Sequence, residues 1–339
     1  MKIAIVKLSA MGDIIHAMLA LQFIKKSNPD IKIDWFVEEV FAPVLQNNPD
    51  IDNIYTLNLK ALKNDKKKLP TEVTKVRTYS KNSYDLVIDA QGLAKSAIVS
   101  RLLGKDIAGF DRTSTREGVS SYLYKRRISS DYCKNVIERN LDVILTPLNI
   151  SYTKKEILEK KPFLFFNQNS EDIEKFLSKD KKNILLIIGA SWDSKIYSKE
   201  KFAKISNILD ENVLIAWGSN EEKESAEFIS SNSNSKVLPK LNLNDLKFLV
   251  SKMDLVIGND TGPTHMAWAL NVPSITIFGC TPGKRNTYIT NINKIIESKS
   301  KVNPLKLKKE DFSINDINEE DIVKIAKELL NDKKDKGLS

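Results

Sequence analysis

Along the first half of the chain, short apolar runs alternate with segments whose apolar residues recur at helical spacing. The runs rich in β-branched and aromatic residues predict strands at 2–6, 31–37 and 84–90. The helical spacing predicts helices at 14–26, which Asn28-Pro29 would end, and at 96–103. Apolar strands that alternate with helices indicate an α/β protein with a buried parallel sheet.

A second series of the same kind begins near residue 183. The predicted strands are 184–188, 213–217, 255–258 and 274–278. The predicted helices are 198–209, 222–230, 246–252 with Asn244 as its N-cap, and a last one that Asn318 caps and that ends near residue 330. A length of 339 residues suits two domains, with the boundary between residues 152 and 182. The chain is therefore predicted to form two doubly wound α/β domains in tandem.

The charge is uneven along the chain. The formal net charge is +9, and residues 1–165 hold 27 Lys and Arg against 19 Asp and Glu, whereas residues 166–339 hold 26 against 25. This indicates an anionic partner on the N-terminal side: nucleic acid, acidic lipid or a polyanionic small molecule. The Lys-rich stretch 60–81 is interpreted as a helix-prone, solvent-facing insertion.

Rare residue types exclude several classes of protein. With two histidines and two cysteines without a CxxC, we expect no metal site built on several histidines, no zinc site and no disulfide framework. The start of the chain has no signal-peptide pattern, and no apolar stretch approaches 18 residues. We therefore expect a protein of a reducing compartment without a membrane span.

Two loops that follow predicted strands carry candidate chemistry. The first holds Ser9, Met11, Gly12, Asp13 and His16, and Asp13 fits either a general base or an acid that a helix N-terminus favours. In a parallel α/β sheet this loop lies at the carboxyl edge, where ligands bind.

The second loop, 258–267, opens a helix whose first amides suit phosphate oxygens. It holds Asp260, Thr261, Gly262 and His265. It matches neither GxxxxGK[ST] nor GxGxxG, so a P-loop and an NAD(P) site are not supported.

Three further loops add single candidates, each of which also has an ordinary structural interpretation. Lys195 could neutralise a phosphate, and Glu222 could accept hydrogen bonds from ribose hydroxyls. Gln91 and Lys95 follow the strand at 84–90. Lys95 could form an anion site together with basic residues further along the chain: Arg112, Arg116, Lys125, Arg126 and Arg127.

Four motifs together carry a resemblance to a known family. KLSAMGDIIHAMLAL, VIDAQGLAKSA, GNDTGPTHMAWAL and IFGCTPG occur in this order and at the family's separations. In these motifs the chain closely resembles the ADP-heptose:lipopolysaccharide heptosyltransferases of glycosyltransferase family 9, over residues 1 to about 285 and in the terminal helix. Any one motif alone would be weak.

The resemblance implies a GT-B fold of two Rossmann-like domains that face a central cleft. The implied domains are an acceptor-binding domain 1–165, an ADP-heptose-binding domain 166–317 and a terminal segment 318–339 that returns towards the first domain. It also implies transfer of L-glycero-D-manno-heptose, with inversion, from ADP-heptose to the inner Kdo of Kdo2-lipid A. No cofactor and no metal are expected.

The resemblance also assigns roles to residues. Asp13 is the implied base, Lys195 meets the diphosphate, Glu222 the ribose, and Leu241 lies by the adenine. The other residues expected at the donor are Ser191, Asp260, Thr261, Gly262 and His265. The acceptor is expected at Ser9, Met11, Gly12, His16, Gln91, Lys95 and Arg116.

The basic N-terminal half suits an acceptor that carries carboxylates and phosphates. We further expect a cytoplasmic location with peripheral contact to the anionic inner membrane through the stretch 60–81, and no nucleic acid. Two alternatives stay open: a transferase that adds the second heptose to an already heptosylated acceptor, and a nucleotide- or polyanion-binding module without turnover.

Overall fold

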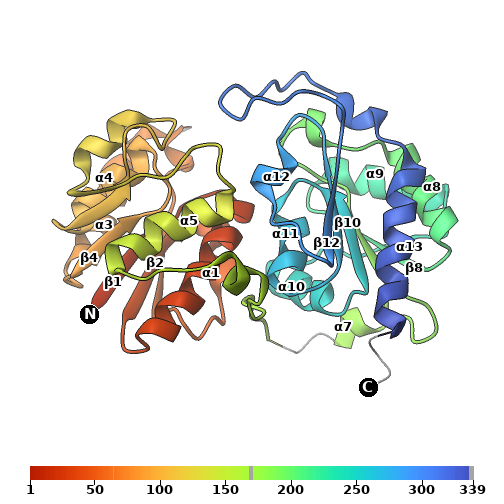
Figure 1. The fold of residues 1–339 in the computed structure, drawn as a ribbon, viewed down its shortest axis with the longest axis horizontal. Helices are drawn as coiled ribbons and strands as arrows, with labels where there is room; N and C mark the ends of the chain where they lie inside the picture. The colour runs from red at the N-terminus through yellow and green to blue at the C-terminus, as the bar shows by residue number, and fades with distance from the viewer. Residues whose placement is uncertain (64, 168–170, 336–339) are drawn as a thin grey trace. The chain divides into compact units, whose positions relative to one another are not determined.

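The structure is a computed structural model that describes residues 1–63, 65–167 and 171–335. The chain divides into two compact units, Met1–Phe165 and Phe166–Ser339. Each unit is built on a six-stranded sheet whose neighbouring strands are all parallel (Figure 1). This confirms the predicted α/β class and the tandem pair of parallel sheets.

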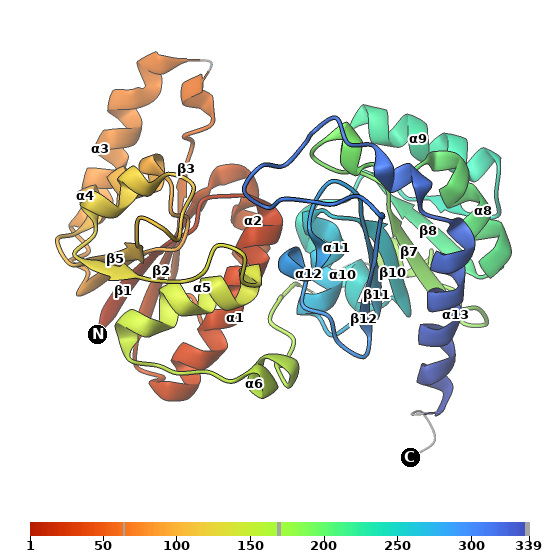
Figure 2. The ribbon, with the colours of Figure 1, turned by 45° about the horizontal axis from the view of Figure 1, so that its top comes forward.

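The first sheet has the strand order β3-β2-β1-β4-β5-β6. Its strands are β1 (Lys2–Val6), β2 (Lys32–Glu38), β3 (Asn53–Leu57), β4 (Leu86–Asp89), β5 (Ile107–Phe110) and β6 (Arg126–Ile128). The helices are α1 (Met11–Ser27), α2 (Ala42–Leu45), α3 (Leu69–Ser80), α4 (Ala94–Leu103), α5 (Val136–Leu145) and α6 (Lys154–Leu158). Helix α1 packs on α5 and α3 packs on α4, so helices cover the central strands, which are buried (Figure 2).

The second sheet has the order β12-β11-β10-β7-β8-β9. Its strands are β7 (Asn183–Ile187), β8 (Asn212–Ala216), β9 (Lys236–Val237), β10 (Leu255–Asn259), β11 (Ser274–Phe278) and β12 (Asn293–Glu297). The helices are α7 (Glu171–Glu174), α8 (Lys199–Leu209), α9 (Asn220–Ser231), α10 (Leu243–Ser251), α11 (Gly262–Ala269), α12 (Gly283–Asn286) and α13 (Glu319–Asp335).

Short 3₁₀ helices fill several connections. They are η1 (Glu39–Phe41), η2 (Ala61–Lys63), η3 (Lys66–Lys68), η4 (Gly118–Leu123), η5 (Thr146–Leu148), η6 (Asp193–Lys195) and η7 (Ser313–Asp316). No helix in the described part of the chain is long and apolar enough to cross a membrane.

Two expectations need correction. The N-cap of α10 is Asn242, whose side chain accepts the amide of Asp245, and not Asn244. The stretch 60–81 is not simply a solvated insertion, because α3 buries Val76 in the core and Glu72 accepts the amide of Asn58 at 3.0 Å. Both outcomes follow from tertiary contacts that a local pattern does not contain.

The apolar residues of the terminal helix α13 enter the core of the second unit, and the helix packs on α8 (Figure 1). The buried residues are Ile322, Val323, Ala326, Leu329 and Leu330. Their spacing of three and four residues forms one apolar face, and that face is fully covered within its own unit.

Candidate active site

In the first unit, the candidate residues gather where the strand order reverses. Strand β1 lies between β2 and β4, so the chain leaves β1 on one side and returns through β4 on the other. The loops after these two strands therefore diverge and leave room at the carboxyl edge, the usual ligand position in an open α/β sheet. They hold Ser9, Asp13 and Gln91.

The side chain of a single glutamine fixes the backbone of the loop after β1. The side-chain oxygen of Gln91 accepts the amides of Leu8 and Ser9, both at 3.0 Å. The peptide bond between Ser9 and Ala10 is cis. The amide of Ala10 then donates to Oδ2 of Asp13 at 3.3 Å. Asp13 is thus held in the first turn of α1, where the helix dipole favours a carboxylate.

Beneath this loop lies the buried carboxylate of Asp89. It stands in the motif VIDAQGLAKSA, but the sequence analysis assigns it no role. Asp89 accepts the amides of Gln91 (2.9 Å) and Gly92 (3.1 Å) and the hydroxyls of Ser96 (2.8 Å) and Tyr124 (2.7 Å). Burial raises the pKa of Asp89, and the four hydrogen bonds oppose that rise. The sequence shows an acid at the end of an apolar strand, three residues before Gly92, but nothing local shows that the fold buries it.

Lys7 is a second buried group that the sequence analysis missed. It is 6% exposed, and its Nζ donates to the carbonyl of Ala90 at 2.8 Å. Burial lowers the pKa of Lys7, while the charges of Asp13 and Asp89 act in the opposite direction. The candidate base therefore has a buried cation in its electrostatic surroundings.

Arg116 reaches the same edge from the loop after β5. Its Nε donates to the hydroxyl of Tyr132 at 2.7 Å, and the Arg116 side chain is exposed. The hydroxyl of Thr115 donates to the carbonyl of Gly92, and the carboxylate of Glu117 accepts the first amide of α4 at 2.7 Å. These bonds join the loop that carries Arg116 to the loop that follows β4.

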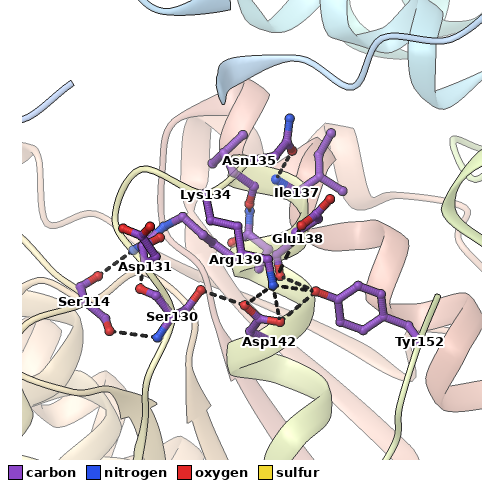
Figure 3. A network of polar contacts seen from close by, with 12 residues as sticks. Ser114, Ser130, Asp131, Lys134, Asn135, Ile137, Glu138, Arg139, Asp142 and Tyr152 are labelled. Carbon is purple, nitrogen blue, oxygen red and sulfur yellow. Dashed lines mark hydrogen bonds and ion pairs between the residues drawn. The ribbon is translucent and has the colours of Figure 1, made fainter. Parts of the chain in front are cut away.

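A buried arginine holds this region in place. Arg139 of α5 is 6% exposed, and its Nη1 donates to the carbonyls of Ser130 (2.8 Å) and Asp131 (2.6 Å). Its Nη2 donates to the carbonyl of Ser114, and the guanidinium lies 5.0 Å from the ring centre of Tyr132. Figure 3 shows how these groups converge. One side chain thus fixes the loops after β5 and β6.

A second set of bonds extends this network. The carboxylate of Asp142 accepts Nζ of Lys134 (2.8 Å) and the hydroxyls of Ser130 and Tyr152, each at 2.7 Å (Figure 3). Every contact is internal to the unit. We therefore interpret this network as the support of the site.

Two of the predicted basic positions do not fit the expected anion site. Lys125 and Arg126 lie at the amino edge of the sheet beside Asp106, with Arg126 bonded to it and Lys125 at 4.0 Å. They are therefore at the opposite end of the strands from Lys95, and the expected grouping is wrong for them. His16 is 3% exposed within α1, which leaves it little surface for a substrate.

In the second unit, the order reverses between β7 and β10. Asp260 follows β10 and is 6% exposed. Its Oδ2 lies 2.6 Å from Nζ of Lys195 and accepts the hydroxyl of Thr281 at 2.8 Å, and its Oδ1 is 3.2 Å from Nε2 of His265. Thr281 is a partner that sequence reasoning missed.

The charge of Asp260 is stabilised by these partners. Burial by itself raises the pKa of Asp260, but Lys195 and His265 lower it by a larger amount. The net pKa of Asp260 therefore lies well below its usual range. The lysine is 13% exposed, so it combines a fixed position with access to solvent. A cation held in this way can meet an anionic ligand with little loss of side-chain entropy.

Helix α11 begins beside Asp260, Lys195 and His265. Its N-cap residue Thr261 is extended and makes no side-chain cap hydrogen bond. Gly262 is the first helical residue, and the hydroxyl of Thr264 instead donates to the carbonyl of Asn259 at 2.8 Å. The positive end of the α11 dipole and the ammonium of Lys195 together favour an anion such as a diphosphate.

Glu222 lies on the β7–β8 side of the same edge. Its Oε2 accepts the amide of Gly218 at 2.6 Å, and a Cβ on Gly189 would fall 1.9 Å from its Oε1. Glu222 and Ala190 line a pocket of about 650 Å³ between the starts of α8 and α9. A carboxylate in such a pocket can accept hydrogen bonds from a pair of vicinal hydroxyls.

The two other donor candidates lie outside these contacts. Ser191 is exposed in the loop that also carries Trp192, whose ring is 5.5 Å from Nζ of Lys195. Leu241 is half-buried just before α10. Within the described ranges, no group of three or more His, Cys, Asp or Glu side chains could hold a metal ion.

Comparisons with known proteins agree on one family. The family model "Glycosyltransferase family 9 (heptosyltransferase)" matches residues 75–313. A Campylobacter coli protein named lipopolysaccharide heptosyltransferase 1 is 42% identical over 98% of this chain and 100% of its own length. A Pseudomonas aeruginosa protein of the same name is 30% identical over 85% of this chain and 81% of its own.

Solved structures extend the likeness to the fold. Escherichia coli heptosyltransferase WaaC, solved with ADP-2-deoxy-2-fluoro heptose, superposes with a TM-score of 0.77 at 22% identity. The match covers 97% of this chain and 99% of that one. At this identity the likeness is one of fold, and it agrees with two Rossmann-like sheets of the GT-B kind.

Proposed function

This chain belongs to glycosyltransferase family 9, the heptosyltransferases, and we propose that it transfers a heptose from ADP-heptose to the inner Kdo of Kdo2-lipid A. The observation that carries the proposal is the 42% identity to a protein named lipopolysaccharide heptosyltransferase 1, which extends over the full length of that relative. The chain is thus a glycosyltransferase that acts in lipopolysaccharide core synthesis.

The donor is proposed to bind in the second unit. The start of α11 and Lys195 would hold the diphosphate, because both present positive charge at one point of the sheet edge. Glu222 would accept the ribose hydroxyls, and Leu241 would pack by the adenine. The remaining donor contacts are assigned to Ser191, Asp260, Thr261, Gly262 and His265.

The acceptor is proposed to bind in the first unit. Asp13 would take the proton of the acceptor hydroxyl, whose oxygen then attacks the anomeric carbon of the heptose on the face opposite the diphosphate. The bond from that carbon to the phosphate oxygen breaks, and ADP leaves with the electron pair, so the configuration inverts. Ser9, Met11, Gly12, Gln91, Lys95 and Arg116 are the proposed acceptor contacts.

Departure of ADP needs a positive environment at the β-phosphate. Lys195 and the α11 dipole would supply it in the second unit without a metal ion. Metal independence is therefore a part of the proposal that EDTA can test directly.

The decisive experiment is a transfer assay with purified protein, ADP-heptose and Kdo2-lipid A, with and without EDTA, followed by product mass. The proposal expects a gain of one heptose that EDTA does not change. A gain only on a heptosylated acceptor would replace it with addition of the second heptose. Binding of ADP-heptose with no gain on either acceptor would leave a binding module without turnover.

We also propose peripheral contact with the anionic cytoplasmic face of the inner membrane through the stretch 60–81. The exposed residues Lys67, Lys68 and Leu69 support it, because lysines near an apolar side chain favour an anionic lipid surface. Lys67→Glu with Lys68→Glu should weaken binding to vesicles that contain phosphatidylglycerol. Unaltered binding would remove this stretch from the proposal.

A further inference from the structure

The short helix η4 (Gly118–Leu123) exposes an unusual amount of apolar surface. Val119 is 64% exposed, Tyr122 63% and Leu123 38%. Helix α4, against which η4 packs, adds Ile98 at 54%. We call Ile98, Val119, Tyr122 and Leu123 the η4 patch. Exposed large apolar side chains that gather on two packed elements mark a candidate interaction surface.

Helix η4 buries polar side chains and exposes apolar ones, which is the reverse of an ordinary surface helix. Ser120 and Ser121 are 1% and 2% exposed, and their hydroxyls donate to the carbonyls of Glu117 and Gly118, both at 2.8 Å. The apolar side chains of the same turn face solvent instead. Because small polar residues satisfy the inner side, packing of the unit does not require Val119 or Tyr122 to be apolar.

Four cations lie close to members of the η4 patch. On α4, Lys95 and Arg101 are three residues before and after Ile98, so the three exposed side chains share one helix face. Beside η4, Arg112 donates to the hydroxyl of Tyr122 at 3.5 Å, and Arg127 donates to the carbonyl of Ser121 at 3.0 Å. Apolar side chains with lysines and arginines beside them match the interface of an anionic bilayer.

The η4 patch is also joined to the proposed acceptor loop. Tyr124, the residue after η4, is 3% exposed and donates its hydroxyl to Asp89, which supports Gln91 and Gly92. Glu117, the residue before η4, accepts the first amide of α4. A lipid surface on the η4 patch would therefore lie beside the loop that binds the polar part of an amphipathic acceptor.

We infer that the η4 patch inserts into the headgroup region of an anionic phospholipid leaflet and presents the acceptor loop to lipid-anchored sugar. This deepens the proposed function and rests on it for the nature of the acceptor. It differs from the contact proposed at 60–81, because that contact is carried mainly by charge, whereas here apolar side chains would enter the interface and the surrounding cations would bind anionic headgroups.

The test measures binding of the full chain, without substrates, to phosphatidylethanolamine vesicles with and without phosphatidylglycerol. Val119→Asp with Tyr122→Asp should lower the vesicle partition coefficient at least about tenfold. The variant loses the favourable free energy of transferring two apolar side chains out of water, and its two new negative charges are repelled by the anionic surface. Leu305→Asp is the control, because Leu305 is 65% exposed and lies in the second unit. The control should bind as the unaltered protein does.

Three results would overturn the inference. They are unchanged vesicle binding of the double variant, an equal loss in Leu305→Asp, or a change in oligomeric state of the double variant in sedimentation velocity, which would make the η4 patch an interface between chains. Transfer to a deacylated, water-soluble acceptor is measured in parallel and should be unchanged in the double variant. If the unaltered protein transfers nothing, the proposed function fails while the vesicle result still decides on the η4 patch.

Discussion

At the scale of single residues, the site depends on charged side chains whose surroundings are set by buried partners. Asp13 is held by a backbone amide and lies within the field of buried Lys7, and Lys195 is paired with buried Asp260. The candidates Asp13, Lys195, Glu222 and Asp260 could be named from the sequence, because each lies in the loop or the first helical turn after an apolar strand. Lys7 and Asp89 could not be assigned roles, since nothing local shows which charged residue the fold buries.

Asp13→Asn should lower the rate of transfer by at least about a hundredfold, because the amide cannot accept the proton of the acceptor hydroxyl. ADP affinity should be unchanged, since the proposed donor site lies in the other unit. Transfer kinetics and calorimetric titration with ADP measure the two quantities. Turnover at the unaltered rate would show that Asp13 is only a favourable acid at the start of α1.

Lys195→Ala should weaken binding of ADP-heptose by about tenfold to a hundredfold, a loss typical of one charge-assisted hydrogen bond. Lys252→Ala is the control, because Lys252 is an exposed lysine at the other end of the strands, after α10. Calorimetric titration compares the two variants. Equal affinity in both would remove Lys195 from the diphosphate site.

At the scale of elements, the loops after the strands were easier to predict than the elements that support them. The pattern identified β1, β4, β7, β8 and β10, whose apolar runs are clear, and hence the five loops that carry candidate residues. It missed β5, β6 and α5, and therefore the role of Arg139. Strands β5 (IAGF) and β6 (RRI) each contain a single β-branched residue, so the local pattern does not identify them as strands and only their pairing in the sheet defines them.

Gly189→Ala should disturb the loop after β7, because the added Cβ would lie 1.9 Å from Oε1 of Glu222. We expect the variant to lose about 1–3 kcal/mol of stability, or to displace Glu222 and weaken ADP binding. Gly218→Ala is the matched control, since its Cβ would meet the same carboxylate at an ordinary 3.5 Å. Thermal unfolding and ADP titration of both variants provide the comparison, and equal behaviour would contradict the close approach.

At the scale of the whole molecule, the chain forms two units that each place their candidate residues at a reversal of strand order. Stability is a property of these units, and buried ionisable groups make it depend on pH. Lys160 is one such group: it is 7% exposed, and burial lowers its pKa to about 7. An unfolded lysine has a pKa of about 10.4.

Between these two pKa values the unfolded chain binds a proton that folded Lys160 has released, so this residue makes stability rise as the pH rises from about 7 to about 10. Lys160→Met should abolish that rise, a difference of roughly 2 kcal/mol between about pH 7 and about pH 9. Urea unfolding at both pH values measures it. Lys161→Met, a change at the exposed neighbour, should keep the dependence of the unaltered protein; loss of the dependence in both variants would refute the assignment.

The sequence by itself determined the α/β class, the two sheets, the loops that carry the site and, through four motifs, the family. These features follow from local periodicity and from residue types next to strands, which a sequence displays directly. Only the tertiary structure decided which charges are buried, that Asp89 and Arg139 support the acceptor loops, that Lys125 and Arg126 lie at the opposite edge of the sheet, and that the apolar face of α13 packs on α8. Each of these depends on contacts between residues distant in the sequence, and the free energy of burial is set by those contacts rather than by the local pattern.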